Sequence, residues 1–340
     1  MTLPTQPTQP STAPSDSTAA PVGITYASAG VDTAAGDRAV ELMKASVAAT
    51  STPAVVGGVG GFAGMVDVSE QRDYRRPLLV GSTDGVGTKV AIAQALDIHH
   101  TIGQDLVGMV VDDIVTVGAR PLFMTDYIAC GRVISERVAD IVRGIATACA
   151  AVGTPLLGGE TAEHPGLMEP DEYDLAGAAT GVVEADRVLG AERVRPGDVL
   201  VAMASSGLHS NGYSLVRSVI EYADWELERQ VPELGRALGE ELLEPTRLYA
   251  RTCLDMIDSL ATDDNPAPIH ALAHVTGGGL AANLARVLPT GLVAEVDRSS
   301  WVVPPVFDVM RALGAVLWED METTLNLGVG MVAVVDPAGV

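Results

Sequence analysis

The sequence is short of cysteine, of basic side chains and of long apolar runs, and each shortage excludes a class of protein. Its three cysteines, Cys130, Cys149 and Cys253, lie far apart and form no Cys-x-x-Cys pair. We therefore expect neither a disulfide framework nor a structural zinc site, and a reducing cytoplasm suits the chain best. No apolar run reaches the roughly 18 residues that a membrane-spanning helix needs.

Basic residues are outnumbered about two to one by acidic ones. The 21 Lys and Arg residues face 44 Asp and Glu residues, which gives a net charge of −23. Nucleic acid and anionic membranes repel such a chain at long range, so we expect neither as a partner. Phosphorylated small molecules remain possible ligands, because backbone amides and bound metal screen phosphate locally.

The N-terminus has no basic residue before Arg38 and no apolar core, so no signal peptide is predicted. Residues 1–22 are rich in Pro, Ser, Thr and Gln and are predicted to form a disordered tail. The length of 340 residues suffices for about two domains. A polar stretch with Pro and Gly at 191–198 marks their boundary, so we predict an N-terminal domain at 23–190 and a C-terminal domain at 191–340.

Hydrophobic periodicity predicts helices that alternate with strands in both halves. In the first half we expect helices from Thr33, over 101–117 and from Ser135, and strands at 78–80, 122–129, 155–157 and 174–184. In the second half we expect strands at 199–203 and 331–335 and helices from Gly212, Thr246 and Gly279. This alternation predicts an α/β chain of the α+β type, with two domains of mixed sheets and helices flanking the C-terminal sheet.

Asp113 falls on the apolar stripe of the helix expected over 101–117. It follows Met109 by four residues, whereas Asp105 and Asp112 share a different face. A carboxylate that faces a core is costly unless it is paired or bound to metal. A functional carboxylate and a buried salt bridge or cap explain this position equally well.

Asp84 stands where a short strand ends in a glycine-rich turn, Asp-Gly-Val-Gly-Thr-Lys, which closes with Lys89. Such a turn presents backbone N–H groups to phosphate, while an Asp can hold Mg²⁺ and a Lys can neutralise phosphate charge. The order of residues is not that of a Walker A loop, which requires Gly-Lys-Ser/Thr. An ordinary turn between a strand and a helix fits the hexapeptide as well.

Glu160 has the same setting, since it follows a short strand and two glycines, Gly158 and Gly159. Asp84, Asp113 and Glu160 could converge to hold one or two metal ions. Hard oxygen ligands without a His or Cys cluster favour Mg²⁺ over zinc.

His209 lies in a loop of Ser, Gly and Asn directly before a predicted helix. A helix N-terminus favours an anion, and His209, Ser210 and Asn211 could each donate to a phosphoryl oxygen. A solvated or capping histidine is the common alternative. The glycine-rich segment 57–64 is a weaker candidate for a phosphate loop and is by default a mobile surface loop, and the chain has no Gly-x-Ser-x-Gly nucleophile motif.

Taken in order, several segments resemble the AIR synthetase family of ATP-dependent enzymes. They are YASAGVD at 26–32, GSTDGVGTK at 81–89, DIVTVGARP at 113–121, GGETAEHPG at 158–166, SSGLHSNGYSL at 205–215, LEPTRLY at 243–249, HVTGGGL at 274–280 and NLGVGM at 326–331. The third segment fits the Asp-x4-Gly-Ala-x-Pro signature of the wider ATP-binding superfamily. The resemblance covers nearly everything outside the tail.

The resemblance implies ring closure of formylglycinamidine ribonucleotide to aminoimidazole ribonucleotide, with ATP converted into ADP and phosphate through an iminophosphate. It also implies a homodimer whose N-terminal domains pair their strands into a shared barrel, with ATP, Mg²⁺ and substrate in a cleft between the domains. The predicted catalytic residues are His209, Lys89 and Asp113, and the predicted metal ligands are Asp84, Asp113 and Glu160. The predicted nucleotide contacts are Gly81, Asp84, Gly85, Gly87, Thr88, Lys89, Asp113, Gly158, Gly159, Glu160, Ser210 and Asn211.

The chain departs from the family pattern at three points. His100 and Thr323 stand where the family usually has an Asp and a basic residue, and Leu325 replaces a Phe. We also expect apolar surface near Val340, where the family normally continues with a helix and a strand. Rival readings are the synthetase of the preceding purine step, thiamine-phosphate kinase, selenophosphate synthetase, and a binding module without catalytic activity.

Overall fold

The first half of the chain folds around a four-stranded mixed sheet in the computed structural model, which describes residues 25–58, 60–263 and 265–340. Its strands are β3 (Pro77–Gly85), β4 (Arg120–Cys130), β5 (Leu156–Glu163) and β6 (Tyr173–Glu184), in the order β3-β6-β4-β5. β6 pairs antiparallel with β3 and β4, and β4 pairs parallel with β5. The predicted tail, residues 1–22, lies outside the described residues.

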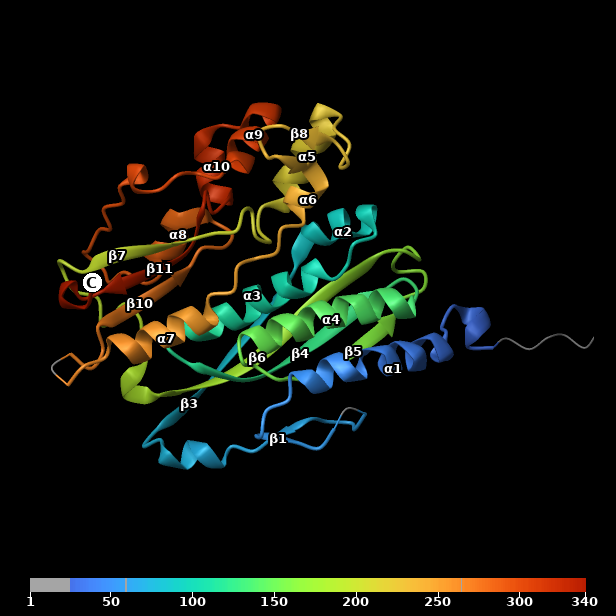
Figure 1. Ribbon diagram of the computed structural model, residues 1–340, viewed down its shortest axis with the longest axis horizontal. Coiled ribbons are helices and arrows are strands. Elements are labelled where there is room, and N and C mark those ends of the chain that lie inside the picture. The colour runs from blue at the N-terminus through green and yellow to red at the C-terminus, as the bar shows by residue number, and fades with distance from the viewer. Residues whose placement is uncertain (1–24, 59, 264) are drawn as a thin grey trace, which may run out of the picture.

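Three helices cover one face of this sheet: α1 (Thr33–Ala49), α3 (Thr101–Thr116) and α4 (Ser135–Ala151) (Figure 1). α1 begins where predicted because the side chain of Asp32 accepts a hydrogen bond from the N–H of Ala35 at 3.0 Å. α3 and α4 pack backbone against backbone, and a short α2 (Val90–Leu96) precedes α3. A methyl group added at Gly103 would lie 2.3 Å from the backbone nitrogen of Ile145, so only glycine permits this approach.

No helix of the described chain covers the other face of β3. Along this strand the side chains alternate between partly buried and exposed positions, and Leu79 is 74% exposed. A two-stranded hairpin of β1 (Val55–Val56) and β2 (Met65–Val66) lies beyond the edge of the sheet and brackets the glycine-rich segment.

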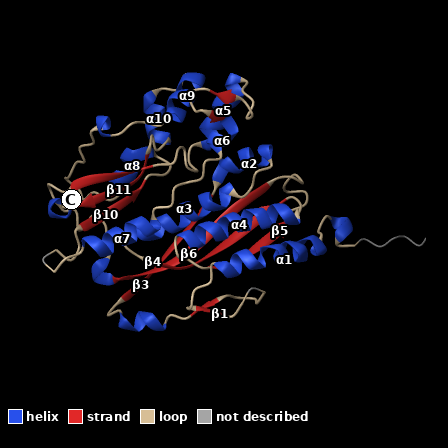
Figure 2. Cartoon of the chain, in the orientation of Figure 1, coloured by secondary structure: helices blue, strands red, loops and turns tan. Residues whose placement is uncertain are grey.

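The second half is built on a three-stranded sheet of β7 (Val199–Ala204), β10 (Ile269–His274) and β11 (Val329–Val335), in the order β10-β11-β7. We expected a mixed sheet here, and these three strands pair antiparallel throughout. The remaining elements are α5 (Tyr213–Ala223), β8 (Gln230–Val231), β9 (Arg236–Ala237), α6 (Leu238–Leu242), α7 (Ala250–Leu260), α8 (Gly279–Ala285), α9 (Pro305–Gly314) and α10 (Trp318–Thr324). In Figure 2, α8, α9 and α10 lie above the smaller sheet, α5 and α6 lie to its upper right, and α7 lies below it.

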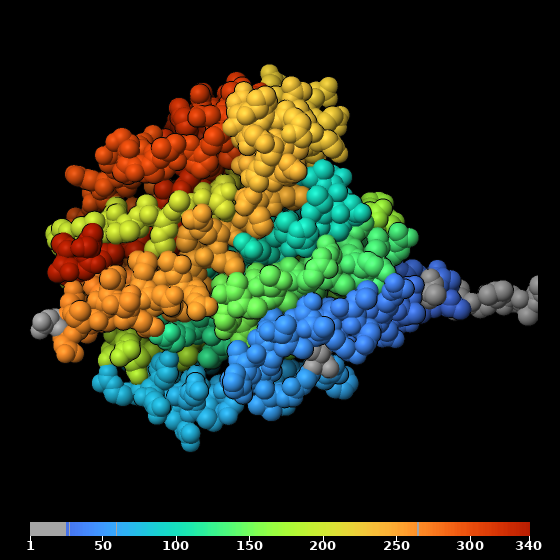
Figure 3. Space-filling view, viewed as in Figure 1, coloured from blue at the N-terminus to red at the C-terminus, as the bar shows by residue number. Residues whose placement is uncertain are grey.

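α7 leaves the second half and packs against α3 of the first half (Figure 1). In the space-filling view of Figure 3 the orange residues of α7 lie directly beside the teal and green residues of α3 and α4. The main apolar core is correspondingly continuous, with buried side chains from both halves such as Ile114 and Cys253. Among the helices that the structure describes, none is both long and apolar enough to cross a bilayer.

Candidate functional site

Asp113 is exposed, contrary to the prediction that it faces the core. Its side chain is 46% exposed, and it is the only exposed residue of α3. Asp105 and Asp112, which we had placed on a different face from the apolar stripe, are fully buried. The prediction failed because α3 is covered on nearly every side, by the sheet, by α4 and by α7. A helix buried all round has no apolar stripe from which to assign faces.

The two buried acids of α3 bind backbone N–H groups from the second half of the chain. Asp105 accepts from the N–H of Thr246 at 2.8 Å. Asp112 accepts from the N–H of Ala250 at 2.7 Å, at the first turn of α7. Their burial is therefore offset by hydrogen bonds, and they attach the segment 246–250 to α3.

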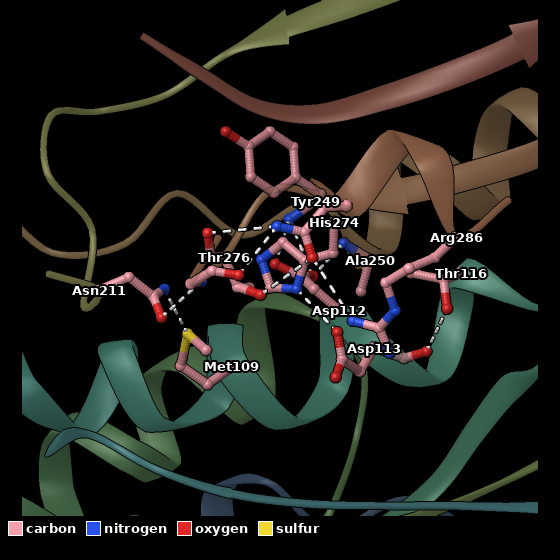
Figure 4. A network of polar contacts seen from close by, with 12 residues as sticks. Met109, Asp112, Asp113, Thr116, Asn211, Tyr249, Ala250, His274, Thr276 and Arg286 are labelled. Carbon is pink, nitrogen blue, oxygen red and sulfur yellow. Dashed lines mark hydrogen bonds and ion pairs between the residues drawn. The ribbon is translucent and has the colours of Figure 1, made fainter. Parts of the chain in front are cut away.

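Asp84, Asp113 and His274 form a charged cluster where the two halves meet. His274 ends β10, and its Nδ1 lies 2.9 Å from Oδ1 of Asp113 (Figure 4). Asp84, near the end of β3, is half-buried, and burial together with the nearby charge of Asp113 raises the pKa of its carboxyl. A carboxylate whose pKa is raised by burial and by a neighbouring carboxylate favours a cation beside the pair.

The same cluster acts on the imidazole of His274. Burial lowers the pKa of His274, but the hydrogen bond to Asp113 and the charges of Asp112, Asp113 and Asp84 outweigh burial and leave that pKa raised. The ring thus carries positive charge more readily than a free histidine. The imidazole of His274 contacts Asp113 from the buried side, and the exposed side of the Asp113 carboxylate is left accessible to a ligand.

The glycine-rich turn lies directly beside this cluster. Oδ1 of Asp84 accepts from the N–H of Gly85 at 2.7 Å, and Gly87 adopts a φ of +73°, which favours glycine. Gly87 and Thr88 are exposed, as is Gly81 farther back on β3. The turn therefore offers accessible backbone and a hydroxyl group next to the carboxylates.

Lys89 does not point toward the accessible side of this turn and of the Asp84–Asp113 cluster, contrary to the prediction that it contacts phosphate. Its side chain is completely buried, and its Nζ lies 2.9 Å from Oδ1 of Asp105. It also donates to the backbone carbonyls of His209 at 2.9 Å and Glu244 at 2.7 Å. An ammonium group has three N–H donors, and these three acceptors use all of them.

The ring of His209 is also buried, so the predicted direct contact with a phosphoryl group is absent from this geometry. Only 1% of the residue is exposed, and its Nε2 accepts from the N–H of Ser206 at 3.2 Å. Burial lowers the pKa of His209 well below its usual value, so the ring is neutral near pH 7.

Ser210 and Asn211 hold the loop 205–212 against its surroundings. Oγ of Ser210 donates to the carbonyl of Val86 in the glycine-rich turn at 2.6 Å. Oδ1 of Asn211 accepts from the N–H of Gly277 at 3.1 Å, and its Nδ2 lies 3.5 Å from the sulfur of Met109 (Figure 4). Asn211 is only partly buried and lies on the same side of α3 as His274.

Glu160 lies apart from the other two predicted metal ligands. Asp84 of β3 aligns with Gly177 of β6, and Gly177 aligns with Asp126 of β4. Asp126 in turn aligns with Gly159, which precedes Glu160. Three strand spacings, about 14 Å, thus separate Asp84 from this point. Residues 25–58, 60–263 and 265–340 contain no group of three His, Cys, Asp or Glu side chains arranged to hold one metal ion, so the predicted convergence of three acids is not formed.

Gly158, Gly159 and Glu160 instead line a cavity of about 810 Å³. Its other walls come from α1, from the glycine-rich segment and from β4, including Asp126. Asp126 is buried beneath Gly159, and burial raises the pKa of its carboxyl to about 7. The cavity is large enough for a small-molecule ligand.

Sequence reasoning missed the roles of His274, Asp105, Asp112 and Asp126. His274 lies in the segment HVTGGGL, which we recognised but to which we gave no chemistry. The run IHALAH at 269–274 forms β10, a strand that the sequence analysis did not predict. A strand that ends in His shortly before a run of glycines, like the end of β3 in Asp84 and Gly85, was the signal available for this residue.

Comparison with known proteins places both halves of the chain in one family. The family described as "AIR synthase related protein, N-terminal domain" matches residues 63–183, and its C-terminal domain matches residues 195–339. Phosphoribosylformylglycinamidine cyclo-ligase from Geobacillus sp. (strain WCH70) is 49% identical over 312 residues, which cover 92% of this chain and 88% of that protein.

Solved structures share the fold at much lower identity. HypE from E. coli is 16% identical, with a TM-score of 0.58 over 90% of this chain and 83% of that one. Thiamine-monophosphate kinase from Stenotrophomonas maltophilia K279a is 17% identical, with a TM-score of 0.57 over 88% of this chain and 86% of that one. These two likenesses describe the fold alone.

Proposed function

The chain belongs to the family of phosphoribosylformylglycinamidine cyclo-ligases, and we infer from this membership that it is an ATP-dependent ligase of purine biosynthesis. It closes the imidazole ring of formylglycinamidine ribonucleotide to give aminoimidazole ribonucleotide, ADP and phosphate. ATP phosphorylates the formyl oxygen, the resulting iminophosphate is attacked by the neighbouring nitrogen, and phosphate leaves. The phosphorylation is needed because an amide oxygen is a poor leaving group and phosphate is a good one.

The observation that carries the proposed site is the pair of Asp84 and Asp113 at the junction of the two halves. Both side chains keep part of their surface accessible, while His274 secures Asp113 from the buried side. The exposed glycine-rich turn lies directly beside them. Carboxylates next to accessible backbone and a hydroxyl group suit the binding of a metal-chelated triphosphate.

Mg²⁺ fits this pair of residues. Their oxygens are hard ligands, and burial and the charge of Asp113 raise the pKa of Asp84, an effect that a bound cation relieves. A site with two carboxylates suits Mg²⁺, which commonly takes its remaining ligands from phosphate and water. When bound, Mg²⁺ offsets the charge on the transferred phosphoryl group.

The other residues of this site bind and orient the ATP phosphates. We assign the backbone of Gly87 and the hydroxyl of Thr88 to the phosphates. Gly85 orients Asp84 through the hydrogen bond that its N–H donates, and Gly81 adds no side chain to β3. Asn211 lies at the edge of the opening. Orientation and charge neutralisation are the main contributions that a protein makes to phosphoryl transfer. Lys89, His209 and Ser210 act on this site from buried positions.

We assign Gly158, Gly159 and Glu160 to a second region of contact with ATP or with the substrate. The cavity that they line is supported as a ligand site by its size and by the glycine-rich segment at its rim. Glu160 is exposed there and is not proposed as a ligand of the same ion as Asp84 and Asp113.

We also propose a homodimer that buries the uncovered face of the N-terminal sheet. Leu79 on β3 and Tyr127 on β4 are 74% and 41% exposed, which supports a partner on this face. Light scattering should then give twice the chain mass of 35.1 kDa. The three free and buried thiols suit work in the reducing cytoplasm.

The function is tested by a coupled assay of ADP release with purified protein. We expect ADP to form only when formylglycinamidine ribonucleotide and Mg²⁺ are both present, together with aminoimidazole ribonucleotide in equal amount. ATP that binds without turnover would identify a binding module instead. Phosphorylation of thiamine phosphate would indicate a kinase of the same fold.

The role of Asp113 is tested by replacing it with Asn. We expect Asp113→Asn to lower kcat roughly 100-fold, because it removes one charged group from the site where phosphoryl charge develops. Asp255→Asn is the matched control, since Asp255 is an exposed acid on α7 that lies 3.9 Å from Nε of Arg251 on the same helix. Equal kcat values for the two variants would remove Asp113 from the mechanism.

A further inference from the structure

Lys89 joins both halves of the chain at one buried point. Its ammonium group lies between Asp105 of α3 and the carbonyls of His209 and Glu244, which belong to two separate loops of the second half. The ring of Tyr213 faces the same nitrogen, with its centre 5.5 Å away. No part of the side chain reaches solvent.

The surroundings of Lys89 already balance its charge. Asp105 carries the opposite charge and also accepts from the N–H and the hydroxyl of Thr246, at 2.8 and 2.6 Å. Burial lowers the pKa of Lys89, and the charges of Asp105 and Glu244 act against that effect. With all three donors used and a carboxylate beside it, the ammonium group has no capacity left for a phosphate.

The carbonyl that Lys89 holds belongs to a residue with an unfavourable backbone. His209 has a φ of +62°, in the left-handed region that residues other than glycine seldom adopt. The two residues that follow it are held too, Ser210 by the carbonyl of Val86 and Asn211 by the N–H of Gly277. The loop 205–211 therefore keeps its shape through contacts with its neighbours rather than through local preference.

Lys89 and Asp84 belong to one short turn, five residues apart. The bond from Lys89 to the His209 carbonyl thus fixes the loop 205–211 directly to the turn that carries a proposed metal ligand. We propose that Lys89 is a positioning residue that holds this loop beside Asp84 and Asp113 and never touches phosphate. The link to catalysis rests on the function proposed above, whereas the burial of Lys89 does not.

Amine labelling tests the buried position without any assay of activity. The chain has only two lysines, Lys44 and Lys89, and the side chain of Lys44 is 48% exposed on α1. An acetylating reagent followed by mass spectrometry of the peptides gives the rate at each lysine. We expect Lys89 in the native protein to react at least tenfold more slowly than Lys44, and its rate to be the same with and without ATP and Mg²⁺. Rapid labelling of Lys89 that ATP suppresses would overturn the proposal.

Substitution tests the positioning role. We expect Lys89→Met to lower kcat at least tenfold while the Kd for ATP stays within about threefold, and to speed amide hydrogen exchange at 206–211 but not in α4. A weaker Kd for ATP with kcat retained would assign Lys89 to phosphate instead. Because Lys89→Met leaves Asp105 buried and unpaired, the double variant Lys89→Met/Asp105→Asn keeps the test usable if the single variant unfolds. If the wild type has no turnover, the labelling and exchange results still decide the position of Lys89.

Discussion

Single carboxylates in this protein differ sharply in their surroundings. Asp255 is exposed on α7, Asp113 is half-exposed beside His274, and Asp126 is buried with its carboxyl against Gly159. Burial outweighs a backbone hydrogen bond and raises the pKa of Asp126 to about 7. Such a group makes the stability of the folded chain depend on pH.

The sign of this dependence follows from proton binding. The unfolded chain releases the Asp126 proton near pH 4, whereas the folded chain keeps it until about pH 7. Between these values the folded state binds more protons, so its stability falls as the pH rises. Asn at this position cannot ionise. We expect the free energy of unfolding of Asp126→Asn, relative to the wild type, to rise by roughly 2 kcal/mol between about pH 5 and pH 8.

Urea unfolding at a series of pH values measures this difference. Asp255→Asn serves again as the control and should follow the wild type across the range. A constant offset between Asp126→Asn and the wild type would show that Asp126 ionises in the folded state near its ordinary pKa.

At the residue scale the sequence indicated candidate residues but did not predict where their side chains lie. It indicated that Asp84 and Asp113 are functional candidates, but it could not show that His274 contacts Asp113 across 161 positions of chain. A pairing at that range depends on the packing of α3 against β10, which no local pattern records. The same limit hid the burial of Lys89, because its three acceptors come from three distant segments.

Among the elements, α3 and α4 approach each other closely at Gly103. An ideal methyl group there would lie 2.3 Å from the nitrogen of Ile145, which is backbone and cannot turn aside. Gly36 in α1 is also helical, but a methyl group at Gly36 would meet nothing within 4 Å. These two glycines form a matched pair for a substitution experiment.

We expect Gly103→Ala to lower the free energy of unfolding by about 3 kcal/mol, because the two helices must separate to admit the methyl group. Gly36→Ala should raise it by about 0.5–1 kcal/mol, because alanine loses less conformational freedom when a helix forms. Thermal and urea unfolding measure the free energy of unfolding of both variants. A Gly103→Ala variant as stable as the wild type would mean that α3 and α4 are farther apart than described.

Element positions followed from local signals where those signals were strong. α1 begins at Thr33, as periodicity predicted. α4 begins at Ser135, but the predicted cap by Ser135 is wrong, because Ile134 is the N-cap and the hydroxyl of Ser135 donates to the carbonyl of Ala35 at 2.8 Å instead. The helix predicted from Thr246 begins at Ala250, because the residues before it are held by Asp105 and Asp112 of α3. The faces of α3 were assigned wrongly for a related reason, since nearly all of the helix is buried. Hydrophobic periodicity identifies the buried face of a helix only when the opposite face is exposed to solvent.

For the whole molecule, the junction of the two halves is where function and fold meet. α3 runs between them and presents Asp113 outward, while Asp105 and Asp112 fasten the second half from inside. The proposed metal ligands thus lie at a junction that is stabilised by buried hydrogen bonds. This arrangement keeps Asp84 and Asp113 in register with the loop 205–211.

A crystal structure with Mn²⁺ in place of Mg²⁺ and a non-hydrolysable ATP analogue tests the central claim most directly. The anomalous signal of manganese locates the ion independently of the protein atoms. We predict a peak within bonding distance of the carboxylates of Asp84 and Asp113, with the triphosphate along the turn at 85–88. A peak elsewhere, with both carboxylates free of metal and phosphate, would contradict the account.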